Sequence, residues 1–255
     1  TLLCAFPDPE AAAATVSAVI SGGIIPAAIE MMDARITAAV EDFVGAGYPR
    51  DAGAVLLVEV DGLSDGTEEI GAEIARIAGE HGASSVRIAA DEGERALLWK
   101  GRKTAFGAIA RIAPDYYLHD TVVPRTRLVE VLRRIYEIAE ANDVLVMNVF
   151  HAGDGNLHPL LVFDGREPGT WDRVRKAGTE ILEACIAVGG TLSGEHGIGL
   201  EKRDMMHRVF TAEDLDAQAR LRDAFDPDGA ANPGKVLPAG SRCGELRSIP
   251  EGTWI

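Results

Sequence analysis

Cysteine is scarce in this sequence of 255 residues, and the few that occur form no disulfide pattern. Cys4, Cys185 and Cys243 are widely spaced and odd in number. This usage excludes a small disulfide-stapled fold and favours a reducing compartment. Cys185 falls within an apolar pattern of helical period, so we expect it to be a core residue.

An apolar run long enough to cross a membrane is also missing. The uncharged stretch 11–29 comes near that length, but Gly22-Gly23 and Pro26 interrupt it. Asp8-Pro9-Glu10, just before it, is typical of a helix start, with an N-cap acid followed by proline. No basic region precedes the apolar residues, as a secretory signal would require. The sequence therefore predicts a soluble protein.

Positive charge is in deficit. Lys and Arg number 25 against 40 Asp and Glu, which gives a net charge of −15. Phosphate backbones and anionic lipid surfaces would be repelled, and this argues against nucleic-acid binding. Excess acid is also common on soluble enzymes, which is the simpler interpretation of the charge.

The sequence does contain a regular alternation of strand and helix patterns. Strands are predicted at 1–6, 27–31, 55–60 and 86–88, and helices from residue 9, around 36–43 and at 68–81. When the helix near Ile36 is set aside, the order is β-α-β followed by β-α-β, which is typical of a ferredoxin-like module. A long helical segment, about 92–112, follows.

The same kind of order then recurs without a repeat of residues. The patterns predict a strand at 116–120, a helix at 128–138, strands at 144–150 and 160–163, and a helix at 171–185. We therefore predict an α+β fold of two ferredoxin-like modules, about 1–112 and 113–190, with a mainly antiparallel sheet and helices packed on it. A small C-terminal helical segment at 191–240 and a tail at 241–255 follow.

Two histidines flank a glycine-rich turn in His151-Ala-Gly-Asp-Gly-Asn-Leu-His158. Both flanks are strand-like, and Gly153-Asp154-Gly155-Asn156 has strong turn chemistry. A tight connection would bring the two imidazoles together, and converging imidazoles make a divalent-metal site. A polar hairpin with two ordinary histidines is the alternative.

A second unusual segment is Ser193-Gly-Glu195-His196-Gly-Ile-Gly. Ser193 is predicted to cap a helix with Glu195 in its first turn. The glycines on either side of His196 permit close approach of a flat ligand. Glu195 would add a third metal ligand, and His196 a base that titrates near neutral pH. By contrast, Asp226-Pro-Asp-Gly and Asn232-Pro-Gly-Lys235 are, by themselves, only turns.

Taken in order, these segments resemble the C-terminal half of the FAD-linked oxidases of the vanillyl-alcohol oxidase type. That family includes the flavoprotein of glycolate oxidase, which is the most similar member, and the D-lactate and D-2-hydroxyglutarate dehydrogenases. The resemblance runs from residue 1 to about Cys243. It extends through the segments Ile25-Pro26, Glu30-Met-Met-Asp33, Gly45-Ala-Gly-Tyr-Pro49, Gly101-Arg-Lys103 and Pro114-Asp-Tyr-Tyr117.

The resemblance implies a division of the protein into two parts. In the family an N-terminal domain holds FAD, and the C-terminal domain covers the flavin and builds the substrate pocket. The sequence starts directly in a predicted strand, so we expect it to be part of a longer protein, without the FAD-binding domain. Residues 1–190 would then form the substrate-binding cap and 191–240 the segment that faces the flavin.

The resemblance also assigns roles to residues. His151, His158 and Glu195 would bind zinc or manganese, and the ion would hold the substrate carboxylate and 2-hydroxyl. His196 would take the hydroxyl proton while hydride passes to FAD. Arg102 would pair with the substrate carboxylate. The residues expected near the flavin are Gly197, Asn232 and Lys235.

Two departures from the 2-hydroxyglutarate enzymes narrow the substrate. Those enzymes carry an asparagine where Leu160 stands and a lysine where Leu118 stands, and both polar groups serve a long dicarboxylate. Leucine at both positions favours a short 2-hydroxy acid, glycolate or D-lactate. The implied partners are this substrate, the FAD-binding domain and other glycolate oxidase subunits, including an iron–sulfur subunit. The expected location is the cytoplasm, or the inner face of the membrane through such subunits.

Other functions stay open. A D-2-hydroxyglutarate-type dehydrogenase is one, and a stand-alone binding domain that keeps the metal site without redox chemistry is another. A metal hydrolase with Glu195 as base fits less well, because Glu195 is already a proposed ligand.

Overall fold

The computed structural model describes residues 1–238. These residues divide after Gly190 into two compact units, which are treated separately. Cys243 and the tail predicted for 241–255 lie outside the described residues.

The first half of the first unit is a four-stranded antiparallel module. Its sheet has the order β4-β1-β3-β2, and α2 is an addition between two neighbouring strands. This arrangement confirms the predicted ferredoxin-like order. The elements are β1 (Leu2–Phe6), α1 (Pro9–Ser21), β2 (Ala28–Asp33), α2 (Ala34–Val44), β3 (Ala54–Glu59), α3 (Ser64–Glu80) and β4 (Ser85–Ile88).

The second half contributes three strands of a similar module, in the order β5-β9-β7. Among the described residues no strand is assigned after α7. The short strands β6 and β8 extend the sheet beyond β7. The elements are α4 (Glu92–Lys103), α5 (Ala105–Ile109), β5 (Asp115–Leu118), β6 (Thr121–Val122), α6 (Leu128–Ala141), β7 (Leu145–His151), β8 (Asn156–Leu157), β9 (Pro159–Phe163) and α7 (Thr170–Ala187).

The long helix predicted for 92–112 is wrong in one respect, since it is two helices. α4 ends at Lys103 and α5 begins at Ala105. The Thr104 hydroxyl donates to the carbonyl oxygens of Lys100 and Gly101. A threonine that bonds back to the preceding turn competes with the helix ladder, which is consistent with the break at this residue.

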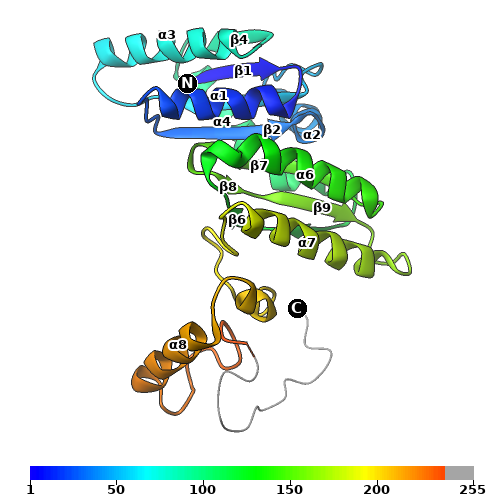
Figure 1. Cartoon of the computed structure of the whole chain (residues 1–255). Coiled ribbons are helices and arrows are strands. Elements are labelled where there is room, and N and C mark those ends of the chain that lie inside the picture. The colour runs from blue at the N-terminus through cyan, green and yellow to red at the C-terminus, as the bar shows by residue number, and fades with distance from the viewer. Residues whose placement is uncertain (239–255) are drawn as a thin grey trace. The chain divides into compact units, whose positions relative to one another are not determined.

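Helices cover both faces of the continuous sheet. One face packs against α1, α3, α6 and α7, and the other against α2, α4 and α5. Figure 1 shows α1, α6 and α7 side by side on one of these faces. Successive residues of β1 face opposite sides: Cys4 belongs to the first core and Leu3 to the second. The α+β prediction with an antiparallel sheet and packed helices is confirmed.

The two halves join where β2 pairs with β7. Next to this seam Asp33 is nearly fully buried. One of its carboxylate oxygens accepts from the backbone N–H of Ile36 and so caps α2, while the other accepts from the backbone N–H of Asn148 and the hydroxyl of Tyr136. Burial raises the pKa of Asp33, although the N–H donors of Ile36 and Asn148 act against this rise. Asp33 thus ties the helix layer of one half to a strand of the other.

Two of the cysteines lie in the core. Cys4 and Cys185 are both fully buried, which confirms Cys185 as a core residue. Burial raises the pKa of the Cys4 thiol to about 12, so the thiolate is not populated near neutral pH.

The second unit contains a 3₁₀ helix at Arg203–Arg208 and α8 (Ala212–Phe225) among its described residues. Thr211 and Asp214 form a capping box at the start of α8.

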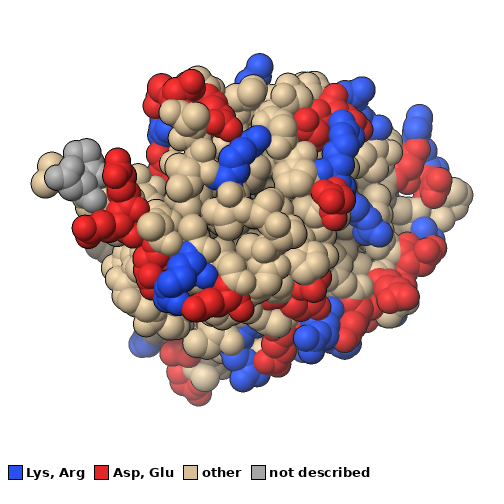
Figure 2. Space-filling model, turned by 90° about the horizontal axis from the view of Figure 1, so that it is seen from above, with Lys and Arg blue, Asp and Glu red and all other residues tan. Residues whose placement is uncertain are grey.

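None of the described helices is long and apolar enough to span a membrane. Figure 2 shows acidic and basic side chains interspersed around an uncharged area on one face of the molecule.

Candidate functional site

The two histidines of the first motif lie at the ends of a tight connection. His151 is the last residue of β7, and His158 stands between β8 and β9. Between them the chain makes a single 3₁₀ turn, Ala152–Asp154, and then reverses at Gly155, so that Asn156 pairs with His151.

Gly155 is required at this reversal for two reasons. Its φ is +71°, a value that L side chains rarely adopt. A Cβ placed there would also lie 2.3 Å from the carbonyl oxygen of Val123. The backbone N–H of Val123 donates to the carbonyl oxygen of Gly155 in return, over 3.0 Å. The turn is therefore packed against its neighbour and fixes the separation of the two histidines.

The two imidazole rings approach edge to face. Their centroids are 5.4 Å apart and the ring planes are inclined by 82°. His158 is buried, whereas the His151 side chain keeps 37% of its surface exposed. The tight connection predicted from the sequence thus brings the two imidazoles together. Metal binding by the pair stays a prediction.

Glu30 lies directly opposite His151 in the β2–β7 pairing. One of its oxygens, Oε1, is 2.7 Å from Nδ1 of His151. The other, Oε2, accepts from Nε of Arg102 at 3.0 Å and forms an ion pair with Nη2 at 2.8 Å. Burial raises the pKa of Glu30, but the hydrogen bond from His151 and the charge of Arg102 outweigh it, so the pKa lies below its ordinary value. Glu30 is therefore a buried carboxylate that holds two partners at once.

Arg102 reaches Glu30 because α4 packs closely on the loop between α2 and β3, which contains Tyr48. A Cβ at Gly101 would lie 2.4 Å from the ring of Tyr48. The Tyr48 hydroxyl donates to the carbonyl oxygen of Leu98 over 2.6 Å, one turn earlier on the same helix. Arg102 is consequently buried and ion-paired. The predicted contact of Arg102 with a substrate carboxylate stays a prediction.

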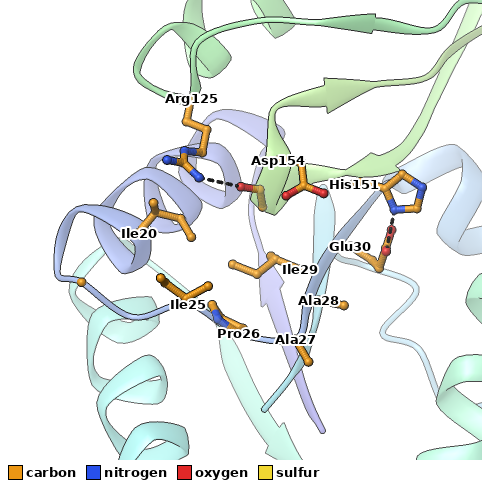
Figure 3. A pocket seen from close by; sticks show the side chains of 12 residues that line it. Ile20, Ile25, Pro26, Ala27, Ala28, Ile29, Glu30, Arg125, His151 and Asp154 are labelled. Carbon is orange, nitrogen blue, oxygen red and sulfur yellow. Dashed lines mark hydrogen bonds and ion pairs between the residues drawn. The ribbon is translucent and has the colours of Figure 1, made fainter. Parts of the chain in front are cut away.

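A pocket of about 360 Å³ opens beside this group. Figure 3 shows the His151–Glu30 contact at one side of it and Arg125, which donates to the carbonyl oxygen of Gly153, at another. Apolar side chains form much of the remaining wall, namely Ile20, Ile25, Pro26 and Ile29. Solvent therefore has access to the neighbourhood of His151 from this side.

The second motif, in the second unit, is a loop. The structure contradicts the predicted helix at Ser193: the Ser193 hydroxyl accepts from the backbone N–H of Gly197 over 2.7 Å and closes a turn instead. The glycine at position 197 has a φ of +84°, and a chain in the left-handed region at this point does not continue as a helix. Glu195 and His196 are about half exposed, with Oε1 and Nε2 3.5 Å apart.

The three residues predicted to lie near the flavin are in two adjoining loops of the second unit. The loop that contains Gly197 is tied to the C-terminal loop by a hydrogen bond from the Val236 backbone to the carbonyl oxygen of Gly199. Asn232 has a positive φ, and both it and Lys235 are exposed. The Asp226-Pro-Asp-Gly turn is closed by the Asp226 carboxylate, which accepts two backbone N–H groups.

The role of Glu30 was not predicted from the sequence, where this residue stands only as part of a family segment. The available signal was a glutamate in the middle of an otherwise apolar strand, because such a charge is buried only with a partner. The strand register, which brings Glu30 opposite His151, supplies what the sequence lacked.

The comparisons with known proteins identify the family of the chain and agree with its fold. Residues 1–236 match the model of the family described as FAD linked oxidases, C-terminal domain. The chain is 47% identical over 248 residues to glycolate oxidase subunit GlcD of Escherichia coli (strain K12), covering 97% of this chain and 50% of that protein. For GlcD of Bacillus subtilis (strain 168) the identity is 38% over 242 residues, covering 95% and 52%.

More distant proteins match in sequence or in fold. A D-lactate dehydrogenase of Archaeoglobus fulgidus is 31% identical over 215 residues, covering 84% of this chain and 46% of that protein. The structure of p-cresol methylhydroxylase superposes with a TM-score of 0.72 at 10% identity, over 93% of this chain and 52% of the other. The chain thus spans about half the length of the relatives that it matches. It belongs to the family of FAD-linked oxidases and corresponds to their C-terminal domain.

Proposed function

We propose that this chain is the substrate- and metal-binding part of a flavin-dependent 2-hydroxy-acid oxidoreductase that converts glycolate or D-lactate into the 2-oxo acid. The observation that carries the proposal is the His151–His158 pair, with Nδ1 of His151 held by Glu30, in a chain of this family. In this proposal residues 1–190 bind substrate, and residues 191–240 face the flavin.

The donor set fits a divalent metal. Two imidazoles converge in the first unit, and Glu195 of the second unit is the proposed third ligand. Two nitrogen ligands and a carboxylate suit zinc or manganese and leave coordination positions for substrate. Such an ion, when bound, would polarise the 2-hydroxyl and the carboxylate of the substrate.

The loops of the second unit fit a flat cofactor. Apart from Gly197 itself and its two chain neighbours, no described residue has an atom within 4 Å of where a Cβ of Gly197 would be, so the backbone there can be approached closely. Asn232 and Lys235, exposed on the adjoining loop, are proposed to lie at the same cofactor. FAD, held mainly by the other half of the protein, would accept the hydride from C2.

His196 and Arg102 would act on the substrate directly. His196 would remove the proton of the 2-hydroxyl as a general base. Arg102 binds Glu30 through its Nε–Nη2 edge, and this directs its Nη1–Nη2 edge away from Glu30. That second edge is the one proposed to pair with the substrate carboxylate.

The size of the substrate is inferred from two leucines. Leu118 and Leu160 face each other directly across the β5–β9 pairing and pack in the same core as the residues around α4. An apolar pair at these positions offers no group for a second carboxylate. This supports a short monocarboxylate over a 2-hydroxyglutarate-type substrate.

The relatives also suggest an assembly. The GlcD proteins are named as subunits of glycolate oxidase. We therefore propose that the protein works with further subunits, an iron–sulfur subunit among them. It would lie in the cytoplasm or at the inner face of the membrane through these partners.

An anaerobic bleaching experiment tests the activity. The form that includes the flavin-binding half is mixed with glycolate, D-lactate or D-2-hydroxyglutarate, and flavin absorbance is followed. Bleaching by glycolate or D-lactate is expected. Bleaching only by D-2-hydroxyglutarate would contradict the inference from the leucines, and no bleaching by any 2-hydroxy acid would favour a binding domain without redox chemistry.

Metal analysis tests the site separately. His158→Ala should lower the zinc or manganese content of the purified protein, whereas His207→Ala, which changes an exposed histidine outside the proposed site, should not. Equal metal content in both variants would refute the ligand assignment.

A further inference from the structure

We infer that Glu30 is a positioning residue that fixes His151 in its Nδ1–H tautomer, so that Nε2 is the nitrogen offered to the metal. The inference rests on the proposed function for the identity of the metal ligands. It does not rest on that function for the tautomer, which is set by contacts inside the first unit.

The hydrogen-bond chemistry decides the tautomer. An ionised carboxylate can only accept hydrogen bonds, and a neutral imidazole has one donor nitrogen and one acceptor nitrogen. Oε1 of Glu30 lies 2.7 Å from Nδ1 of His151, so Nδ1 must carry the proton. The lone pair of the ring is then on Nε2, on the side away from Glu30. Carboxylates that hold metal-binding histidines in this way orient the ring and raise its basicity.

Arg102 keeps Glu30 in this state. The carboxylate is buried, and an unpaired buried charge would be costly. Nε of Arg102 donates to Oε2, and Nη2 is ion-paired with the same oxygen, which leaves Oε1 for His151. Because His151 and Glu30 are also direct partners across two antiparallel strands, the backbone holds the contact in register. Arg102, Glu30 and His151 therefore form one connected chain of polar contacts, from α4 to the proposed metal ligand His151.

The variant Glu30→Gln changes the hydrogen-bonding groups in this chain of contacts but keeps the size of the side chain. A glutamine has one oxygen acceptor and one NH₂ donor. Arg102 can only donate, so the amide oxygen is expected to face Arg102 and the NH₂ group to face Nδ1 of His151. Nδ1 must then accept, and the proton moves to Nε2, where it blocks the metal position.

Two measurements on the 255-residue chain test the inference. The first is the nitrogen NMR spectrum of His151 without metal, which distinguishes the two tautomers. We expect the Nδ1–H tautomer in the original sequence and the Nε2–H tautomer in Glu30→Gln. The second is a competition titration with Zn²⁺ against a chelator, in which Glu30→Gln should bind roughly 10- to 100-fold more weakly.

A rescue and a matched control separate positioning from general damage. In Glu30→Gln combined with Arg102→Met, the amide oxygen is released to face His151, so the Nδ1–H tautomer and the Zn²⁺ affinity should return. Glu59, on the neighbouring strand β3, is the control. It also accepts a hydrogen bond from an arginine of α4, Arg95. Glu59→Gln should leave the tautomer and the Zn²⁺ affinity unchanged.

The outcomes separate this inference from the proposed function. An Nε2–H tautomer of His151 in the original sequence overturns the role of Glu30, whatever the metal does. The same holds if Glu30→Gln keeps full Zn²⁺ affinity. Zn²⁺ binding that does not depend on His151 and His158 refutes the proposed metal site, while the tautomer result still decides the role of Glu30.

Discussion

The residues of the proposed site lie in different kinds of structure in the two units, a sheet in the first and an exposed loop in the second. In the first unit His151 and His158 lie on strands of a continuous sheet or directly beside them, next to a buried ion pair and a turn packed against Val123. In the second unit Glu195 and His196 are half exposed on a loop, in which the backbone N–H of Gly197 donates to the Ser193 hydroxyl.

This difference teaches how the site is organised. Groups fixed by strand pairing keep their geometry before any ligand arrives, because the cost of ordering them is met during folding. Groups on an exposed loop leave more of that ordering cost to the moment when a ligand binds. The histidines are thus the preorganised part of the proposed site.

The largest expected effect concerns the division of labour within the loop. In the complete enzyme, His196→Ala should leave the metal bound and slow the chemical step by roughly 10²–10⁴-fold, as expected for a lost general base. Glu195→Gln should lower metal content and activity together. Metal analysis combined with single-turnover reduction of the flavin measures both. If His196→Ala removes the metal while turnover per bound ion stays fast, the two roles are reversed.

The second prediction compares one glycine from each unit. Both Gly155 and Gly197 have a positive φ, but only Gly155 lies against backbone, with a Cβ position 2.3 Å from Val123. Gly155→Ala should therefore lower the free energy of unfolding by roughly 3–5 kcal/mol, from strain and overpacking together. Gly197→Ala should cost only about 1 kcal/mol, from strain alone.

Chemical denaturation of the two alanine variants measures this difference. A comparable loss of stability in both would contradict the contrast between a packed turn and an open loop. If Gly197→Ala is stable but fails to retain FAD in the complete protein, the contrast is sharpened, because the site would then need the open space at this glycine.

The smallest effect concerns the acid stability of the first unit. Burial raises the pKa of Glu59, but hydrogen bonds from Thr1, Trp99 and Arg95 lower it by more, so the pKa in the folded chain is below its ordinary value. A carboxylate whose pKa is lower in the folded chain stabilises the fold at pH values above its pKa in the unfolded chain, which is about 4.3 for glutamate. This contribution to the free energy of unfolding is lost as the pH falls through the pKa of the folded chain.

Glu59→Gln should consequently weaken the fall in unfolding free energy below about pH 5. At pH 7 it should cost less than about 1 kcal/mol, because the pair with Arg95 is partly exposed. Denaturant titrations at several pH values check both statements, with Glu69→Gln on the exposed surface of α3 as control. An unchanged acid slope in Glu59→Gln would show that this carboxylate does not contribute.

Much of the first unit could be predicted from the sequence because its signals are local. The N-cap at Asp8, the alternating strand residues and the turn at Gly155 each depend on a few neighbouring residues, and the structure has them as expected. The helix break at Thr104 and the turn at Ser193 were missed because a serine or threonine hydroxyl can bond either to a helix end or to its own turn.

The contacts at the site were harder to predict, because they are not local. Glu30 and His151 are 121 residues apart in sequence. Nothing in either segment specifies the strand register that places them opposite each other. The same applies to Leu118 and Leu160, whose importance came from the family resemblance and whose direct pairing came from the structure.

The seam between β2 and β7 also has a kinetic consequence. The contacts that create the His151–Glu30 pair close a loop of about 120 residues, and pairings with such long separation form slowly because the entropy of closure comes first. Each half can bury much of its own helix layer before the seam forms. The proposed metal site should accordingly appear late in folding, and the time course of Zn²⁺ uptake by refolding chain would report the docking of the two halves.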